Sequence, residues 1–186
     1  LNLYKEAFKK QYESLGATVN VLNLITENPS NEDIESMILS ADAIYVSCGS
    51  SYLMMREWRK RGVDKLLRQA YDKGTVMSGL SAGAIAWSKY VNSDSFYTDK
   101  SLKLDALGWI NALICPHYDS ENYRKDSFKN MIKEMPELVG IALDEHAAVE
   151  IVDDKFRIHS YGPGGKAFKC YWKNEEYYTE EIISID

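Results

Sequence analysis

The chain has 186 residues, of which 45% are hydrophobic and 27% charged, a composition typical of one globular domain with a substantial core. The formal net charge is −6 and no basic face is evident, which argues against a nucleic-acid-binding surface. No apolar run approaches the roughly 18–20 residues that cross a bilayer, and no signal peptide is visible, so we expect no membrane partner.

The first half of the chain alternates helical and strand-like patterns. Residues 2–16 indicate a helix that ends at a glycine, and residues 17–24 are rich in β-branched and apolar side chains, which predicts a strand. Ser30 or Asn31 then caps a helix whose first turn is acidic. Residues 42–48 form a short apolar run, as expected for a strand buried on both faces.

Two further helices are predicted over residues 51–62 and 63–74, and residues 75–81 predict another strand with a tight turn at its end. This alternation of strands and helices predicts a mostly parallel sheet with helices on both faces. In such sheets ligands bind beyond the carboxyl ends of the strands. The turns at residues 47–51 and 78–83 both lie at such ends, so we expect them to face one crevice.

The second half is less regular. The elements expected there are a strand that runs into a loop at 110–119, a helix over 120–135 capped by Ser120, strands within 138–162 joined by a turn at Asp153 and Asp154, and a final strand at 166–172. Neither a repeat nor a linker divides the chain, so residues 1–186 are expected to form a single domain.

The beginning of the sequence is unusual for this fold class. Wound α/β domains commonly open with a strand. This sequence opens with Leu1 and a predicted helix instead. We therefore expect an N-terminal strand to be missing from it, the alternative being an unusual fold.

The three cysteines are Cys48, Cys115 and Cys170, an odd number at wide spacing and without a Cys-x-x-Cys pair. This pattern is typical of free thiols in a reducing compartment rather than of a disulfide framework. We therefore expect a cytoplasmic protein.

The sequence GLSAG at residues 79–83 carries the strongest chemical signal. A Gly-x-Ser-x-Gly turn between a strand and a helix leaves no room for side chains beside the serine, and it lifts the hydroxyl of Ser81 into the crevice. The turn also directs the N–H of Ala82 toward the same point, where the unpaired amides of a helix start stabilise an oxyanion. The alternative is a turn that merely requires small residues.

A serine hydroxyl needs a neighbouring base to act as a nucleophile. Of the three histidines, His117 follows a predicted strand and Pro116 fixes the backbone before it, so its loop would reach the same end of the sheet as Ser81. His146 and His159 lie within strand-like runs and are better explained as core or surface positions.

The group that orients the histidine is left open by the residues themselves. An acid is expected, because a carboxylate fixes the imidazole tautomer and stabilises its charged form. A solvated loop position is the plain alternative for each candidate. The candidates are Asp94, Asp99, Asp119, Asp144 and Glu145.

Taken in order, these motifs resemble peptidase family S51, which contains dipeptidase E (aspartyl dipeptidase) and, more distantly, cyanophycinase. The matching stretches are IYVSCGSSYLMM at 44–55, GLSAGAIAW at 79–87, NSDS at 92–95, CPHYDS at 115–120 and GIALDEHAAVEI at 140–151. The ordered set covers nearly the whole chain and is most similar to peptidase E-like proteins of Gram-positive bacteria.

The resemblance implies a flavodoxin-like, three-layer α/β sandwich related to class I glutamine amidotransferases, with serine in place of their cysteine. It implies a serine-type peptidase acting on short peptides through an acyl-enzyme, as a monomer or homodimer, with no metal or organic cofactor. Ser81 matches the family nucleophile and His117 its base. Asp94 matches the acid of the triad, with Asp99 in reserve.

The resemblance also implies substrate contacts. The N–H groups of Gly49 and Ala82 would hold the oxyanion, although the turn SCGSS at 47–51 replaces the family's glycine run followed by Asn-Thr. Dipeptidase E prefers an N-terminal aspartate, which calls for a cation, and Arg124 is the nearest candidate. Glu145 is expected to bind a substrate ammonium group, with Asp119 as a further substrate contact.

Two other functions are compatible with the motifs. An α/β-hydrolase esterase shares the order serine, acid, histidine, but only 117 − 81 = 36 residues separate Ser81 from His117, which leaves little room for that fold's further elements. A catalytically inactive binding or sensing protein is favoured by the altered SCGSS turn. A cysteine amidotransferase is disfavoured, because the elbow carries serine and Cys48 lies in a different turn.

Overall fold

The structure is a computed structural model that describes residues 2–95, 102–153, 155–161 and 164–183. The helices are α1 (Asn2–Glu13), α2 (Asn31–Leu39), α3 (Ser51–Arg61), α4 (Val63–Asp72), α5 (Ala82–Ile85) and α6 (Asn122–Lys133). The strands are β1 (Ala43–Val46), β2 (Val76–Gly79), β3 (Ser88–Ser93), β4 (Leu102–Asp105), β5 (Ile110–Cys115), β6 (Val139–Leu143), β7 (Ala147–Val152), β8 (Lys155–Ser160), β9 (Ala167–Lys173) and β10 (Glu176–Glu181).

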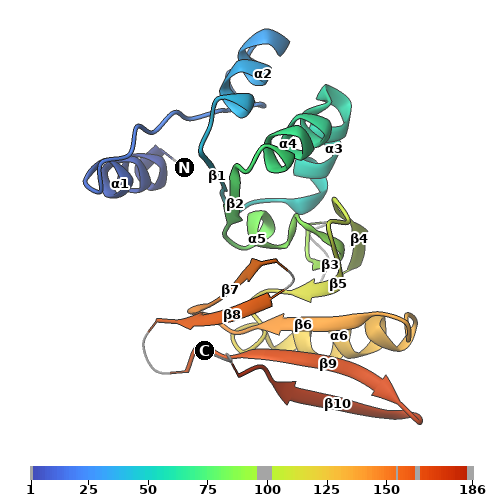
Figure 1. Ribbon diagram of the computed structural model, residues 1–186. Helices are drawn as coiled ribbons and strands as arrows, with labels where there is room; N and C mark the ends of the chain where they lie inside the picture. Colours follow the sequence, from blue (N-terminus) through green and yellow to red (C-terminus); the bar gives the residue numbers. More distant parts are fainter. Residues whose placement is uncertain (1, 96–101, 154, 162–163, 184–186) are drawn as a thin grey trace.

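Parallel pairing lies at the centre of the sheet structure. Strands β1 and β2 pair in parallel, and a second sheet has the order β10-β9-β6-β5-β3-β4, in which β3, β5 and β6 are parallel. The outer strands β4, β9 and β10 pair antiparallel, and β7 and β8 form a separate hairpin. This is the expected α/β architecture, and in it the ends of β2, β3, β5 and β6 surround one region (Figure 1).

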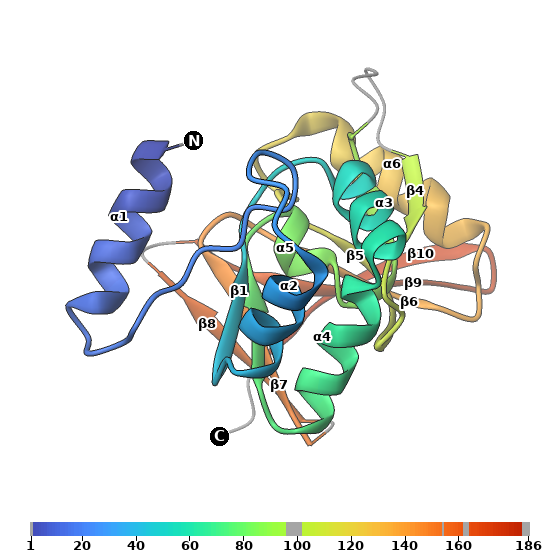
Figure 2. The same cartoon turned by 90° about the horizontal axis from the view of Figure 1, so that it is seen from above.

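Helices α2, α3 and α4 group around one core, and Figures 1 and 2 show them on the same side of the molecule as β1 and β2. Ser30 caps α2, because its Oγ accepts the N–H of Asp33 at 3.0 Å, and this fixes the helix start that the sequence predicted. Ile34 and Ile38 then point one face of α2 into the core, where Trp58 and Leu67 of the next two helices are also buried.

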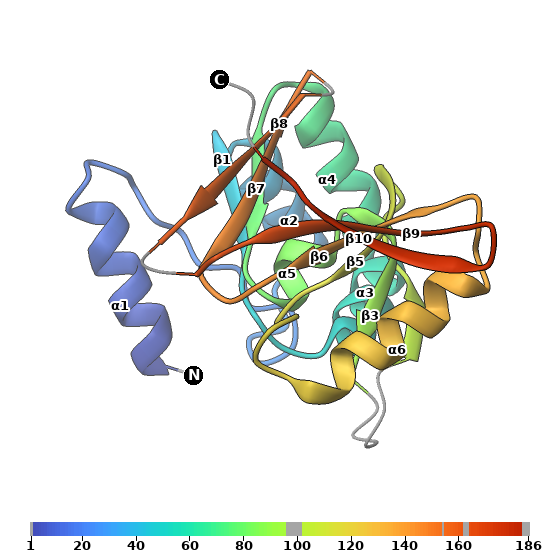
Figure 3. The same cartoon turned by 90° about the horizontal axis from the view of Figure 1, so that it is seen from below.

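Helix α6 packs along the six-stranded sheet and makes contacts with β3, β5, β6 and β9 (Figure 3). Phe128 and Ile132 of α6 are fully buried there. A Cβ placed on Gly140 of β6 would lie 2.3 Å from Ile132 Cδ1, so the glycine is what lets the helix approach the sheet this closely. This second core holds the end of β5 in place beside β6. None of the helices in the described part of the chain is long and apolar enough to cross a membrane.

Three sequence predictions for individual elements are wrong. Residues 17–24 are extended or turn-like but form no strand, because no strand in the described ranges lies beside them to accept their backbone hydrogen bonds. Ser120 does not cap α6, since the residue at the N-cap is Glu121. The chain does not finish its strands at 166–172, because β10 follows β9 in an antiparallel hairpin. Of the expected turn at 153–154, Asp153 has a positive φ of 50°, and Asp154 lies outside the described residues.

Candidate active site

Ser81 lies two residues after the end of β2, in a backbone conformation that few residues adopt. Its φ and ψ are 54° and −116°, and helix α5 begins at the next residue. A Cβ on Gly79 would lie 2.4 Å from the backbone of Gly83, and one on Gly83 would lie 2.0 Å from the carbonyl oxygen of Val46. The two glycines therefore let the turn fold tightly against β1, and the turn holds the serine in a strained elbow.

His117 approaches Ser81 from the end of β5. Its Nε2 lies 2.9 Å from Ser81 Oγ, which is hydrogen-bonding distance. The residue has a positive φ of 56°, and Tyr118 next to it donates its N–H to the carbonyl of Leu143 at 3.0 Å. This bond ties the loop after β5 to the end of β6. The imidazole is mostly covered, with 24% of the side chain exposed.

The other ring nitrogen of His117 contacts a carboxylate. Nδ1 hydrogen-bonds Glu145 Oε1, and because an ionised carboxylate only accepts, the hydrogen is on Nδ1. Nε2 is then left unprotonated and able to accept the hydroxyl hydrogen of Ser81. The hydrogen bond from His117 is the main reason that the pKa of Glu145 lies below its ordinary value, which keeps this carboxylate charged.

Asp94, the expected acid of the triad, does not lie against His117. It follows β3, and its carboxylate pairs with Arg124 Nη2 at 3.3 Å. In the sheet β5 lies between β3 and β6, so each side of the histidine loop has one acid at a neighbouring strand end. The acid after β6, Glu145, is the one that reaches the imidazole. Asp99, the alternative, lies outside the described residues.

Arg124 is buried at the start of α6, with a relative exposure of 2%. Its Nη1 donates to Asn92, at 2.8 Å to the carbonyl oxygen and 3.1 Å to the side-chain oxygen. Its Nε donates to Glu121, and Asp94 pairs with Nη2. The guanidinium is therefore already matched by two carboxylates, so the expectation that Arg124 binds a substrate carboxylate does not fit this arrangement.

Asp119 and Ser120 face the protein rather than a substrate position. Asp119 Oδ1 accepts the backbone N–H of Glu145 at 2.8 Å. Ser120 Oγ donates to Glu145 Oε1 at 3.0 Å, the oxygen that also contacts His117. The two expected substrate contacts of this region, Asp119 and Glu145, are thus engaged with each other, and Glu145 is also engaged with the histidine.

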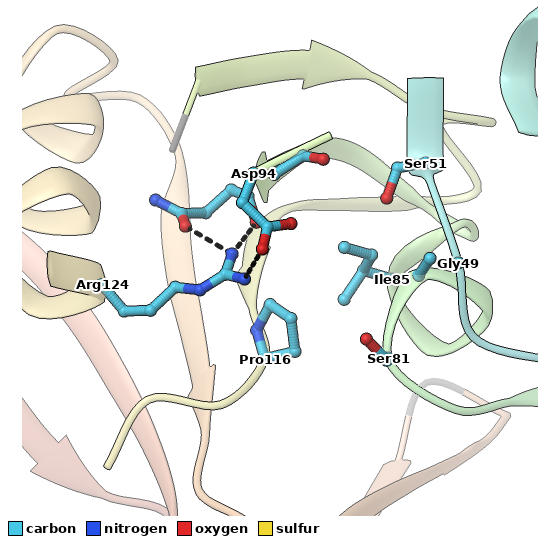
Figure 4. Close-up of a pocket in the computed structure, with 10 residues that line it drawn as sticks. Gly49, Ser51, Ser81, Ile85, Asp94, Pro116 and Arg124 are labelled. Atoms are coloured by element: carbon cyan, nitrogen blue, oxygen red, sulfur yellow. Dashed lines mark hydrogen bonds and ion pairs between the residues drawn. The ribbon is translucent and has the colours of Figure 1, made fainter. Parts of the chain in front are cut away.

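A small pocket opens next to Ser81 (Figure 4). Gly49 lies in its wall with a φ of 146°, a conformation suited to glycine, so the turns after β1 and β2 do face one crevice. Figure 4 shows Asp94 and Arg124 on the side of the pocket opposite Ser81 and Gly49. The pocket is lined by Gly49, Ser51, Ser81, Ala82, Ile85, Asn92, Ser93, Asp94, Pro116 and Arg124.

The remaining candidates serve other contacts. His159 lies on β8 and pairs with Glu150 at 2.8 Å on the exposed hairpin, while the ring of His146 lies 6.2 Å from that of Tyr161. Burial, with the nearby charge of Asp119, raises the pKa of Asp144. In the described part of the chain, no group of three or more histidine, cysteine, aspartate or glutamate side chains could hold a metal ion.

The sequence left Glu145 among several candidate acids and also suggested a substrate contact for it, and the structure places its carboxylate against His117. Its position in the chain could have indicated the contact with His117. Glu145 comes two residues after the end of β6, and His117 comes two residues after the end of β5. Equivalent ends of neighbouring parallel strands lie side by side. That β5 and β6 are neighbours could not be read from spacing.

The chain is similar in sequence to known peptidases. The family model that matches the chain is described as "Peptidase family S51" and covers residues 2–159. "Uncharacterized peptidase YgaJ" of Bacillus subtilis (strain 168) is 32% identical over 174 residues, which are 93% of this chain and 74% of that protein. "Uncharacterized peptidase Lmo0363" of Listeria monocytogenes is 33% identical over 132 residues, 67% of this chain and 62% of that protein.

Two solved structures share the fold. A crystal structure of a candidate peptidase E protein from Listeria monocytogenes EGD-e superposes with a TM-score of 0.68 at 26% identity, covering 87% of this chain and 80% of that one. A peptidase from an acI-B1 Actinobacterium superposes with a TM-score of 0.71 at 17% identity, covering 100% of this chain and 75% of that one, and supports the fold alone. The expected peptidase E-like, flavodoxin-like α/β fold is confirmed.

Proposed function

Because the chain belongs to peptidase family S51 and is thus a peptide hydrolase, we propose that it is a serine-type peptidase in which Ser81, His117 and Glu145 form the catalytic triad. The observation that carries this proposal is the continuous hydrogen-bonded chain from Ser81 Oγ to His117 Nε2 and from His117 Nδ1 to Glu145. In it each group has the neighbour that its role requires, a base for the hydroxyl and a carboxylate for the base.

The reaction is acyl transfer to water. Ser81 Oγ attacks the peptide carbonyl while its proton moves to His117 Nε2, and Glu145 stabilises the imidazolium that forms. The imidazolium then gives this proton to the leaving amine, and a water molecule, deprotonated by His117, hydrolyses the acyl-enzyme. The N–H groups of Gly49 and Ala82 receive the oxyanion, an interaction worth about 3–4 kcal/mol per donor in serine peptidases.

The substrate is a short peptide with a free ammonium group. Asp94 supports this, because its carboxylate lines the pocket beside Ser81 and remains half-exposed while pairing with Arg124. Glu145 no longer fits the ammonium role, since it is engaged by His117. A preference for N-terminal aspartate is not part of the proposal, because the arginine of the pocket, Arg124, is already matched by carboxylates.

A dipeptide library tests the proposal. The purified protein is incubated with dipeptides that vary the first residue, including Asp-Xaa, Ala-Xaa and Lys-Xaa, and with N-acetylated versions of each. We expect hydrolysis of unblocked dipeptides, little hydrolysis of acetylated ones, and none by Ser81→Ala. Undiminished hydrolysis by a folded Ser81→Ala variant would remove the proposal, and hydrolysis of p-nitrophenyl esters with no hydrolysis of any dipeptide would favour an esterase.

A further inference from the structure

We propose that Ser120 and Asp119 are positioning residues that hold Glu145 against His117, an inference that rests on the function proposed above. Ser120 Oγ donates to Glu145 Oε1 at 3.0 Å, and Asp119 Oδ1 accepts the backbone N–H of Glu145 at 2.8 Å. The glutamate is thus held at its carboxylate and at its main chain by two consecutive residues.

A glutamate in this place needs such restraint. Its side chain is 42% exposed, and it lies in the loop after β6 rather than in a strand or helix. A long, partly exposed side chain has many rotamers, and fixing one of them costs side-chain entropy. A catalytic carboxylate must nevertheless stay within about 0.5 Å of its productive position, in hydrogen-bonding contact with the imidazole N–H, to hold the tautomer and orientation of the ring. Hydrogen bonds from Ser120 and to Asp119 supply this restraint from outside the residue.

The restraint comes from the loop that carries the histidine itself. Asp119 and Ser120 follow His117 by two and three residues, and Glu121 closes the loop by donating its N–H to the His117 carbonyl at 3.2 Å. When this loop moves, the imidazole therefore moves together with the groups that hydrogen-bond Glu145. The pairing of β5 with β6 brings Glu145 and His117 together, and the segment that carries the histidine adds the local contacts that hold the glutamate in place.

Asp119 and Ser120 have opposite electrostatic effects on the carboxylate of Glu145. Asp119 places a like charge near Glu145, which works against the ionised form of the glutamate. Asp119 therefore helps to hold Glu145 through the hydrogen bond that its Oδ1 accepts, and not through its charge. Ser120 acts in the opposite sense, since a donated hydrogen bond stabilises the charged carboxylate. Asparagine at position 119 keeps the acceptor and removes the like charge, and threonine at 120 keeps the hydroxyl.

The test is the second-order rate constant for labelling Ser81 with a fluorophosphonate probe, which needs no knowledge of the natural substrate. Ser120→Ala and Ser120→Thr are compared in the wild-type chain and in a Glu145→Ala chain. In the wild-type background we expect Ser120→Ala to lower the rate about tenfold or more, the worth of one hydrogen bond to a charged group, and Ser120→Thr to recover most of it. In the Glu145→Ala background we expect no further loss from Ser120→Ala.

Variants of Asp119 test the positioning role independently. Asp119→Asn should retain most of the labelling rate and Asp119→Ala should lose it, with thermal unfolding confirming that each variant is folded. An unchanged rate in Ser120→Ala, or an equal loss from Ser120→Ala in both backgrounds, would overturn the positioning role. Failure of the wild-type protein to label at Ser81 is a different result, because it would refute the proposed function and the positioning role with it.

Discussion

At the scale of single residues, the candidate site depends on a backbone turn that only small residues can form. The elbow at Ser81 brings Gly83 so close to β1 that an added Cβ would lie 2.0 Å from the Val46 carbonyl oxygen. The serine and the glycines around it were recognised in the sequence because this turn type limits which residues fit. The contact with Val46 was not, since it depends on how β1 and β2 pair.

Replacing Gly83 with alanine should therefore destabilise the whole protein. We expect a loss of at least about 2 kcal/mol in the free energy of unfolding, because the turn and the backbone of Val46 must move apart to admit the methyl group. Gly74→Ala is the matched control, since Gly74 has a φ of +98° but nothing within 4 Å of an added Cβ, so its cost is about 1 kcal/mol from backbone conformation alone. Urea unfolding measures both. Equal losses would mean that crowding at the elbow is unimportant.

Substitutions of Glu145 and of Asp94 are expected to have different kinetic effects. Glu145→Gln keeps the size of the side chain but removes the charge that stabilises the imidazolium, so kcat should fall by about 10³-fold or more. Asp94→Asn should mainly raise KM for unblocked peptides, because Asp94 is assigned to substrate binding. Steady-state kinetics on the dipeptide that the library identifies distinguishes them. A larger loss of kcat in Asp94→Asn than in Glu145→Gln would restore the sequence-based assignment of the acid.

At the scale of elements, the segment from Pro116 to Arg124 carries His117 and leads from β5 into α6. Arg124 anchors it from inside the protein through Glu121, Asn92 and Asp94. Partial burial alone would raise the pKa of Glu121, but hydrogen bonds from Tyr123 and Arg124 outweigh it and leave the pKa below its ordinary value of 4.5. Glu121 therefore stabilises the folded state as a carboxylate.

This lowered pKa predicts how stability depends on pH. A group with a lower pKa in the folded state contributes its stabilisation above the unfolded pKa, here near 4.5, and loses it as the pH falls through the folded pKa. The difference in melting temperature between wild type and Glu121→Gln should thus be largest near pH 7 and shrink below about pH 4.5. Thermal unfolding at both ends of this range measures it. A difference that grows on acidification would contradict the pairing.

The elements themselves were predictable where a local signal marks them. Ser30 as a helix cap and Gly62 at the end of α3 act within a few residues, and the sequence offered Ser30 or Asn31 as the cap and a helix boundary after residue 62. Residues 17–24 have the composition of a strand, but a strand also needs a partner edge, which composition cannot supply. The order of β3, β5 and β6, which places Asp94 and Glu145 at strand ends on either side of the histidine loop, is likewise a property of the assembled sheet.

At the scale of the whole molecule, three loops after parallel strands converge on one end of the sheet structure. The turn after β2 provides the hydroxyl, the loop after β5 the imidazole and the loop after β6 the carboxylate. Two hydrophobic cores, one beneath α2 to α4 and one beneath α6, hold these strands from different sides. The family resemblance predicted this architecture and the proximity of Ser81 and His117, and the structure shows that Glu145 is the candidate acid that contacts the histidine.

The central claim, that His117 and Glu145 make the hydroxyl of Ser81 nucleophilic, is tested most directly by locating the covalent adduct formed with a fluorophosphonate. The folded protein is treated with the probe, digested, and analysed by peptide mass spectrometry, beside His117→Ala and Glu145→Gln. We expect one adduct, on Ser81, formed at a rate that falls steeply in both variants. An unmodified Ser81, or a Ser81 that labels equally fast without the imidazole, would contradict it.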